Sequence, residues 1–151
     1  MRTYLVIFDE SPEAEIALRF AARRAGKTGG NVHILAIVPP PEFVQWGGVQ
    51  ATMEEEARQR AEAMVMGSAG TMMQELGVRP VITVKTGEPA PTIRKMLEEE
   101  SSIAALVLGA AAHGAPGPLI SHFINSESSK LRCPIMIIPG GLSKDEIDRL
   151  S

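Results

Sequence analysis

Two patterns of apolar and polar residues alternate along the chain: short runs of apolar residues and longer amphipathic stretches. Five runs have the length of strands, and most are apolar at consecutive positions, which is typical of strands buried on both faces of a sheet. They cover residues 4–8, 32–38, 81–86, 104–108 and 134–138. The third run alternates more than the others, so we expect it nearer an edge of the sheet.

The amphipathic stretches between the runs carry the start and stop signals of helices. The first helix begins at Ser11 and Pro12, whose residue types are preferred at a helix N-cap and first turn. Further helices are predicted at residues 53–76, 90–100 and 119–131 and after Ser143, which opens a capping-box pattern. In the longest of them, Gly67 and Gly70 weaken the middle and allow a kink or break.

This alternation of strands and helices predicts one architecture. Parallel strands joined by helices require right-handed crossovers, which place helices on both faces of the sheet. We therefore expect an α/β fold, a three-layer doubly wound sandwich around a five-stranded parallel sheet, and we take the order of its strands to be 3-2-1-4-5. The chain has 151 residues, which fits a single domain spanning residues 1–151.

Doubly wound sheets bind ligands at the carboxyl ends of their strands, where the strand order reverses. In the predicted order the first and fourth strands flank this point, so Asp9 and the loop from Gly109 to Gly117 become neighbours. Asp9 either accepts hydrogen bonds from a ribose or base, or caps the next helix together with Ser11. The small-residue loop either lets its backbone approach a phosphate or is a plain tight connection. The residues alone leave both alternatives open.

Other side chains offer little catalytic or metal chemistry. His113 lies in that loop and His122 after it, yet Asp and Glu are absent between Glu100 and Glu127. We therefore expect no metal site and no catalytic residue. The single cysteine, Cys133, excludes an intrachain disulfide framework and is expected to be an inert thiol.

Charge and hydropathy narrow the class of protein. The formal net charge is −3, so no global field attracts nucleic acid. No apolar run is long enough to cross a bilayer or to form the core of a signal peptide, so we expect a cytoplasmic protein with no membrane partner. His33 lies within a buried run and is interpreted as a structural histidine.

The order and spacing of several short motifs resemble the universal stress protein family. The first strand ends in VIFDES at residues 6–11, and a Gly-x-Pro turn at residues 87–89 precedes the third helix. The fourth strand ends in LVLG at residues 106–109, and CPIMIIP at residues 133–139 contains the fifth. This resemblance covers nearly the whole chain. It implies a stress-response protein that binds an adenine nucleotide, ATP or AMP, in a regulatory and non-catalytic role.

The ATP-binding branch of that family carries the motif Gly-x2-Gly-x9-Gly-Ser/Thr, from which this chain departs. Gly109 matches the first glycine, His113-Gly114 is nearest to the second, and the final pair falls on Ser121 and His122. Because these two residues replace a glycine and a small hydroxyl, we expect weakened triphosphate contacts. The implied site residues are Asp9, Ser11, Ile37, Gly109, His113, Gly114, Gly117, Ser121 and His122.

The resemblance also implies a homodimer formed through the last strand, which begins at Pro134 and ends at Ile138. The apolar residues of this strand are expected at a sheet edge, and bare apolar edges favour pairing. The alternative is a dimeric stress or scaffold protein of the same fold that binds no nucleotide, which the degenerate motif favours. A redox flavoprotein or dinucleotide domain has little support, because no GxGxxG fingerprint follows the first strand.

Overall fold

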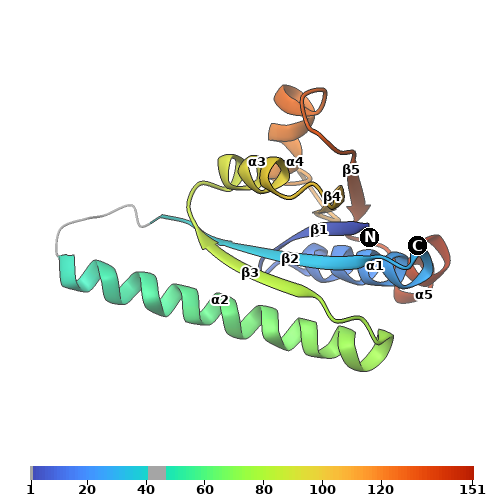
Figure 1. Cartoon of the computed structure of the whole chain (residues 1–151), viewed down its shortest axis with the longest axis horizontal. Helices are drawn as coiled ribbons and strands as arrows, with labels where there is room; N and C mark the ends of the chain where they lie inside the picture. The colour runs from blue at the N-terminus through green and yellow to red at the C-terminus, as the bar shows by residue number, and fades with distance from the viewer. Residues whose placement is uncertain (1, 41–46) are drawn as a thin grey trace.

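The computed structural model describes residues 2–40 and 47–151, in which strands and helices alternate (Figure 1). The strands are β1 (Thr3–Phe8), β2 (Asn31–Val38), β3 (Val81–Thr86), β4 (Ile103–Ala110) and β5 (Ile135–Pro139). The helices are α1 (Pro12–Thr28), α2 (Gly47–Leu76), α3 (Pro89–Glu99), α4 (Pro118–His122), the π-helix η1 (Phe123–Glu127) and α5 (Lys144–Leu150). Each predicted strand is present, with its ends shifted by at most two residues.

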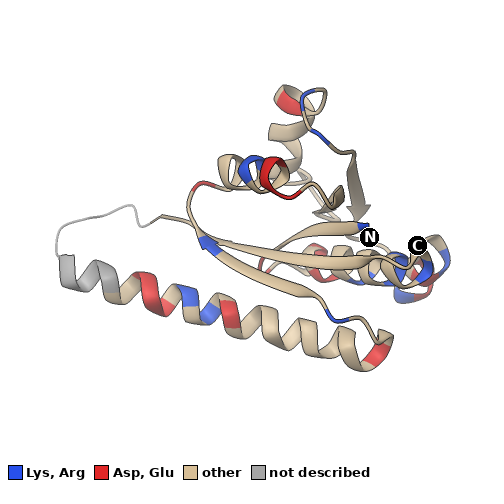
Figure 2. Cartoon of the chain, in the orientation of Figure 1, with Lys and Arg blue, Asp and Glu red and all other residues tan. Residues whose placement is uncertain are grey.

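The five strands form one parallel sheet of order β3-β2-β1-β4-β5, which confirms the predicted topology. β1 is central, and its Leu5 pairs with His33 of β2 and with Leu106 of β4. Figure 2 shows that charged residues gather on the helices and loops, and Lys85 is the only Lys, Arg, Asp or Glu within the described strands. Strands this poor in charge fit a sheet that is covered on both faces.

Two apolar clusters, one on each face of the sheet, form the core. On one face Val6 and its neighbours pack against α1 and α2, and Ile147 of α5 joins this cluster with no exposed surface. On the other face Leu5 belongs to a cluster with Ile93 of α3 and Phe123 of η1. Because adjacent residues of β1 enter opposite clusters, the chain has the predicted three layers.

Helix α1 begins as the sequence predicts. The Ser11 hydroxyl accepts a hydrogen bond from the Ala14 amide at 3.3 Å, and Pro12 occupies the first turn. The helix ends at Gly29, whose φ of 68° is a left-handed conformation that glycine adopts without strain. The N-cap residue Ser11 lies only three residues after the end of β1. The start of α1 therefore forms one side of the switch point.

The helices differ from the predictions at three places. α2 begins at Gly47, six residues before its predicted start at residue 53. α2 is a continuous helix of 30 residues, so the break allowed at Gly67 and Gly70 does not occur. The helix predicted over residues 119–131 is α-helical only as far as His122; a π-helix follows from Phe123 to Glu127, and the prediction is wrong beyond Glu127, where the helix has ended. Residues five apart lie about 140° apart around an α-helix, whereas the wider π turn brings His122 and Glu127 onto one side.

Candidate functional site

Two clefts open at the carboxyl edge of the sheet and share Asp9, which directly follows β1. The first, here called the loop cleft, has a volume of about 110 Å³ and lies between β1, β4, α1 and the loop that precedes α4. The second, here called the α2 cleft, has a volume of about 220 Å³ and lies between α2 and the ends of β1 and β2. At the switch point of the sheet, one cleft therefore lies on each side of Asp9.

Asp9 is tied to the start of α1 and still has a free oxygen. Its Oδ1 accepts a hydrogen bond from the Ser11 amide at 2.9 Å and a second, short one from the Ser11 hydroxyl. Its Oδ2 has no hydrogen-bond partner among the described residues, and the residue is exposed. The capping and ligand-binding interpretations of Asp9 are thus compatible, because each uses a different oxygen.

Gly109 packs closely against the backbone of helix α1. A Cβ added at this position would overlap the carbonyl oxygen of Glu13 and lie 2.7 Å from its carbonyl carbon. The first turn of α1 therefore requires glycine at the end of β4. Glu13 itself lines the loop cleft, so this contact sets the distance between two of the cleft's walls.

The loop after β4 is a closed turn with few amide donors. The Ala111 amide donates to the Pro116 carbonyl at 3.0 Å, and Gly114 and Gly117 have φ of 77° and 132°. Those angles favour glycine, which accounts for both positions without a ligand. Pro116 and Pro118 carry no amide hydrogen, so two positions of the loop cannot donate to a phosphate.

The final pair of the degenerate motif lies outside both clefts. Ser121 and His122 are exposed on α4. The His122 Nε2 is 3.4 Å from Glu127 Oε2, and Glu127 Oε1 accepts from Arg94 of α3 at 2.8 Å. The sequence did not mark this carboxylate as a partner of His122, because a spacing of five residues does not bring side chains together in an α-helix.

The nine predicted site residues are thus divided among three places. Asp9, Ser11, Gly109 and Gly117 line the loop cleft, and Asp9 and Ile37 line the α2 cleft. His113, Gly114, Ser121 and His122 line neither cleft.

The two clefts are also lined by residues that were not predicted from the sequence. Glu13 and Ile120 contribute to the loop cleft, whereas Arg60 and Met64 of α2 contribute to the α2 cleft. The acidic side chains Asp9 and Glu13 line the loop cleft without any Lys or Arg among its described lining residues. Nothing in the sequence marked the α2 residues, because only the packing of that helix brings them to the sheet edge.

His33, at the other end of the sheet, has both ring nitrogens satisfied within the protein. Its Nε2 lies 2.7 Å from Thr83 Oγ1, its Nδ1 lies 3.3 Å from Glu100 Oε2, and the residue is 5% exposed. The residue therefore links β2 to β3 and to the end of α3, as its structural interpretation predicted.

Over residues 2–40 and 47–151, no group of three or more His, Cys, Asp and Glu side chains is arranged to hold a metal ion. Within the same ranges, no helix has both the length and the apolar character needed to cross a membrane.

The sequence pattern of the universal stress protein family matches residues 1–139. The chain belongs to this family. The match ends at the last residue of β5, so it includes the whole sheet and leaves α5 outside. No curated protein sequence is significantly similar to the chain.

Solved structures of universal stress proteins share this fold at low sequence identity. UspA from Lactobacillus plantarum is 18% identical, with a TM-score of 0.76 over 91% of this chain and 97% of that one. A universal stress protein from Archaeoglobus fulgidus in complex with dAMP is 18% identical, with a TM-score of 0.58 over 91% and 98% of the two chains. Another universal stress protein, in complex with cAMP, is 14% identical, with a TM-score of 0.59 over 91% and 96%.

Proposed function

We propose that this universal stress protein binds an adenine nucleoside or nucleotide at Asp9, in the cytoplasm and in a regulatory rather than catalytic role. The observation that carries the proposal is that Asp9, which lines both clefts at the switch point of a doubly wound sheet, has an Oδ2 without a partner among the described residues. Two universal stress proteins of the same fold are described in complex with dAMP and with cAMP, which supports this class of ligand.

The sizes of the clefts favour a ligand that extends across Asp9. Pockets for small ligands usually have volumes of about 300–1,000 Å³. The loop cleft, at about 110 Å³, is too small to hold a nucleotide by itself, and the α2 cleft has about 220 Å³. A nucleoside that places its ribose at Asp9 reaches both clefts, with Ile37 as an apolar wall on the side of the base.

The charges of the loop cleft favour adenosine or AMP at least as much as ATP. A triphosphate directed into this cleft would approach Asp9 and Glu13, and Pro116 and Pro118 offer it no amide hydrogen. Each lost hydrogen bond to a charged group weakens binding by about 1.5–3 kcal/mol, or roughly one to two decades of affinity. Losses of this size remove any preference for the triphosphate.

The test is calorimetric titration with adenosine, AMP and ATP, after any nucleotide released by heat denaturation has been identified. We expect adenosine and AMP to bind the wild type at least as tightly as ATP, and Asp9→Ala to weaken all three. Asp9→Asn keeps an acceptor for the Ser11 cap and therefore separates ligand binding from helix capping. Tight ATP binding with weak AMP binding would contradict the charge argument.

A dimeric scaffold that binds no nucleotide is the second candidate. It is favoured by the position of Ser121 and His122 outside both clefts. Failure of all three ligands to bind, with the protein folded, would support this candidate and overturn the first.

Under either candidate we propose a homodimer paired through β5. This strand is at a sheet edge, and Ile137 on it is 38% exposed. We also propose that residues 1–151 fold as one domain, since Ile147 of α5 is buried in the same cluster as the sheet.

A further inference from the structure

The C-terminal strap, defined here as residues 140–150, lies beyond the part of the chain that matches the family and is closely tied into the fold. It consists of a short connection after β5 and of helix α5. A complete capping box between Ser143 and Glu146 closes the start of the helix. Ile147 is fully buried in the core cluster that contains α1. The strap is therefore a packed element of the structure.

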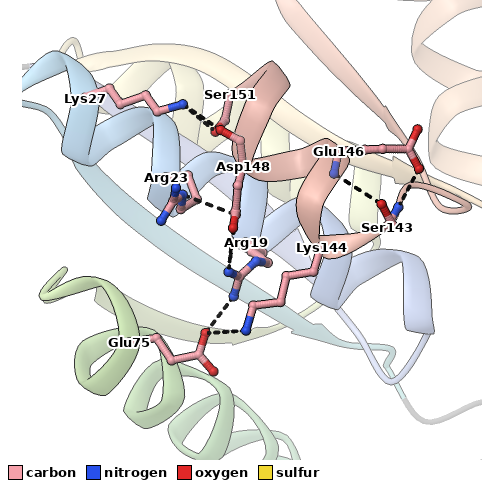
Figure 3. A network of polar contacts seen from close by, with 9 residues as sticks. All are labelled: Arg19, Arg23, Lys27, Glu75, Ser143, Lys144, Glu146, Asp148 and Ser151. Atoms are coloured by element: carbon pink, nitrogen blue, oxygen red, sulfur yellow. Dashed lines mark hydrogen bonds and ion pairs between the residues drawn. The ribbon is translucent and has the colours of Figure 1, made fainter.

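Figure 3 shows the polar network that holds α5 against α1 and α2, with Arg19 at its centre. Arg19 pairs with Glu75 of α2 at 2.6 Å and with Asp148 of α5 at 3.2 Å. Asp148 also lies 3.2 Å from Arg23, and Lys144 lies 3.7 Å from Glu75. Asp148 thus joins α5 to two cations of α1 at once.

The connection between β5 and α5 packs on the base of the candidate site. The Gly140 amide donates to the Ala110 carbonyl at 2.7 Å. A Cβ at Gly140 would overlap that carbonyl oxygen and lie 2.9 Å from the Cβ of Glu13. Glu13 also contacts Gly109. The first turn of α1, the end of β4 and the connection after β5 are therefore closely packed at this point. Glu13 and Gly109 are both walls of the loop cleft.

We propose that Asp148 is a positioning residue of the candidate site, acting through the C-terminal strap. By holding α5 on α1, it keeps Gly140 pressed against Ala110 and Glu13, and this contact holds the loop after β4 in place. When α5 leaves α1, the connection is released and the loop at residues 111–117 loses one of its supports. The shape of the loop cleft then depends on the ionic strength, because salt screens partly exposed ion pairs.

Hydrogen exchange measured by mass spectrometry on the full chain without ligand tests this inference independently of the nucleotide proposal. The variants are Asp148→Ala and, as a control of equal charge change, Asp145→Ala. Asp145 is exposed on the same helix, and no ion pair joins it to the described residues. Two partly exposed ion pairs, each in the upper half of the usual range of strength but below its limit, correspond together to about a tenfold change in docking.

We expect exchange in α5 and at the Ala111 amide, whose hydrogen bond to Pro116 closes the loop, to rise together, about tenfold, in Asp148→Ala and in wild type at 1 M salt, but not in Asp145→Ala. The strands should keep their protection. Faster exchange in α5 with an unchanged loop would overturn the coupling, and unchanged exchange in α5 would overturn the role of Asp148. A chain ending at Leu142 is the second variant, and a folded truncation in which the Ala111 amide keeps its wild-type protection would also contradict the proposal.

Discussion

Gly109 at the end of β4 lies against the backbone of Glu13 in the first turn of α1, at a distance that leaves no room for a side chain. Gly109→Ala should therefore lower the free energy of unfolding by about 1–3 kcal/mol, near the upper end because backbone atoms must move. Urea denaturation measures this change as a lower midpoint.

Gly26 is the matched control for this substitution. It lies within α1, has no atom within 4 Å of an added Cβ, and has no positive φ. Gly26→Ala should stabilise the protein by about 0.5–1 kcal/mol, because alanine loses less backbone entropy in a helix. Equal midpoints for the two variants would contradict the close packing of β4 on α1.

Acid should weaken the attachment of α5. The hydrogen bond and charge of Arg19, together with Lys144, hold the pKa of Glu75 below its usual range. Partial burial opposes the ionisation of Asp148, but Arg19, Arg23 and Lys144 outweigh it and lower the pKa of that carboxyl as well. Folded-state pKa values below the unfolded ones contribute stability that is present at neutral pH and lost as the pH falls through the folded values.

The measurement is the thermal midpoint of the wild type and of Asp148→Asn between pH 7 and pH 3. We expect the wild type to have the higher thermal midpoint at pH 7. The difference between the two midpoints should shrink below about pH 4, where carboxyl groups protonate. A difference that is constant over this range would show that ionised Asp148 does not stabilise the fold.

Cys133 should react slowly in the folded protein. Burial raises the pKa of its thiol, an effect that Arg132 and the Leu106 amide only partly oppose, and the residue is 9% exposed. Because the thiolate is the reactive form, a disulfide reagent at pH 8 should label the native protein more than about tenfold more slowly than the unfolded one. Equal rates would indicate an accessible thiol.

The β5 edge should carry the homodimer contact. Ile137→Lys places a charge on this apolar edge and should convert the dimer into a monomer in light scattering at micromolar concentration. Val81→Lys is the control, since Val81 is 49% exposed on β3, the opposite edge of the sheet. A wild-type monomer, or a dimer that survives Ile137→Lys, would contradict the β5 interface.

Local patterns determined most of the fold and part of the candidate site. The continuous apolar run of β1 predicted a strand buried on both faces, and Ser11 and Pro12 predicted the start of α1. The alternation of strands and helices then predicted a parallel sheet with crossovers of one hand, and the order 3-2-1-4-5 was one of the arrangements compatible with it. The position of Asp9 at the switch point followed from that order alone.

Only the tertiary structure decided what these residues contact. The role of Gly109 depends on how closely α1 approaches β4, and the pairing of His122 with Glu127 depends on a π turn that no sequence signal announced. The ion pairs of Arg19 join residues 56 and 129 positions apart in the chain. Sequence periodicity reports which face of an element is apolar, whereas contacts between distant polar residues arise only once the packed core has brought their helices together.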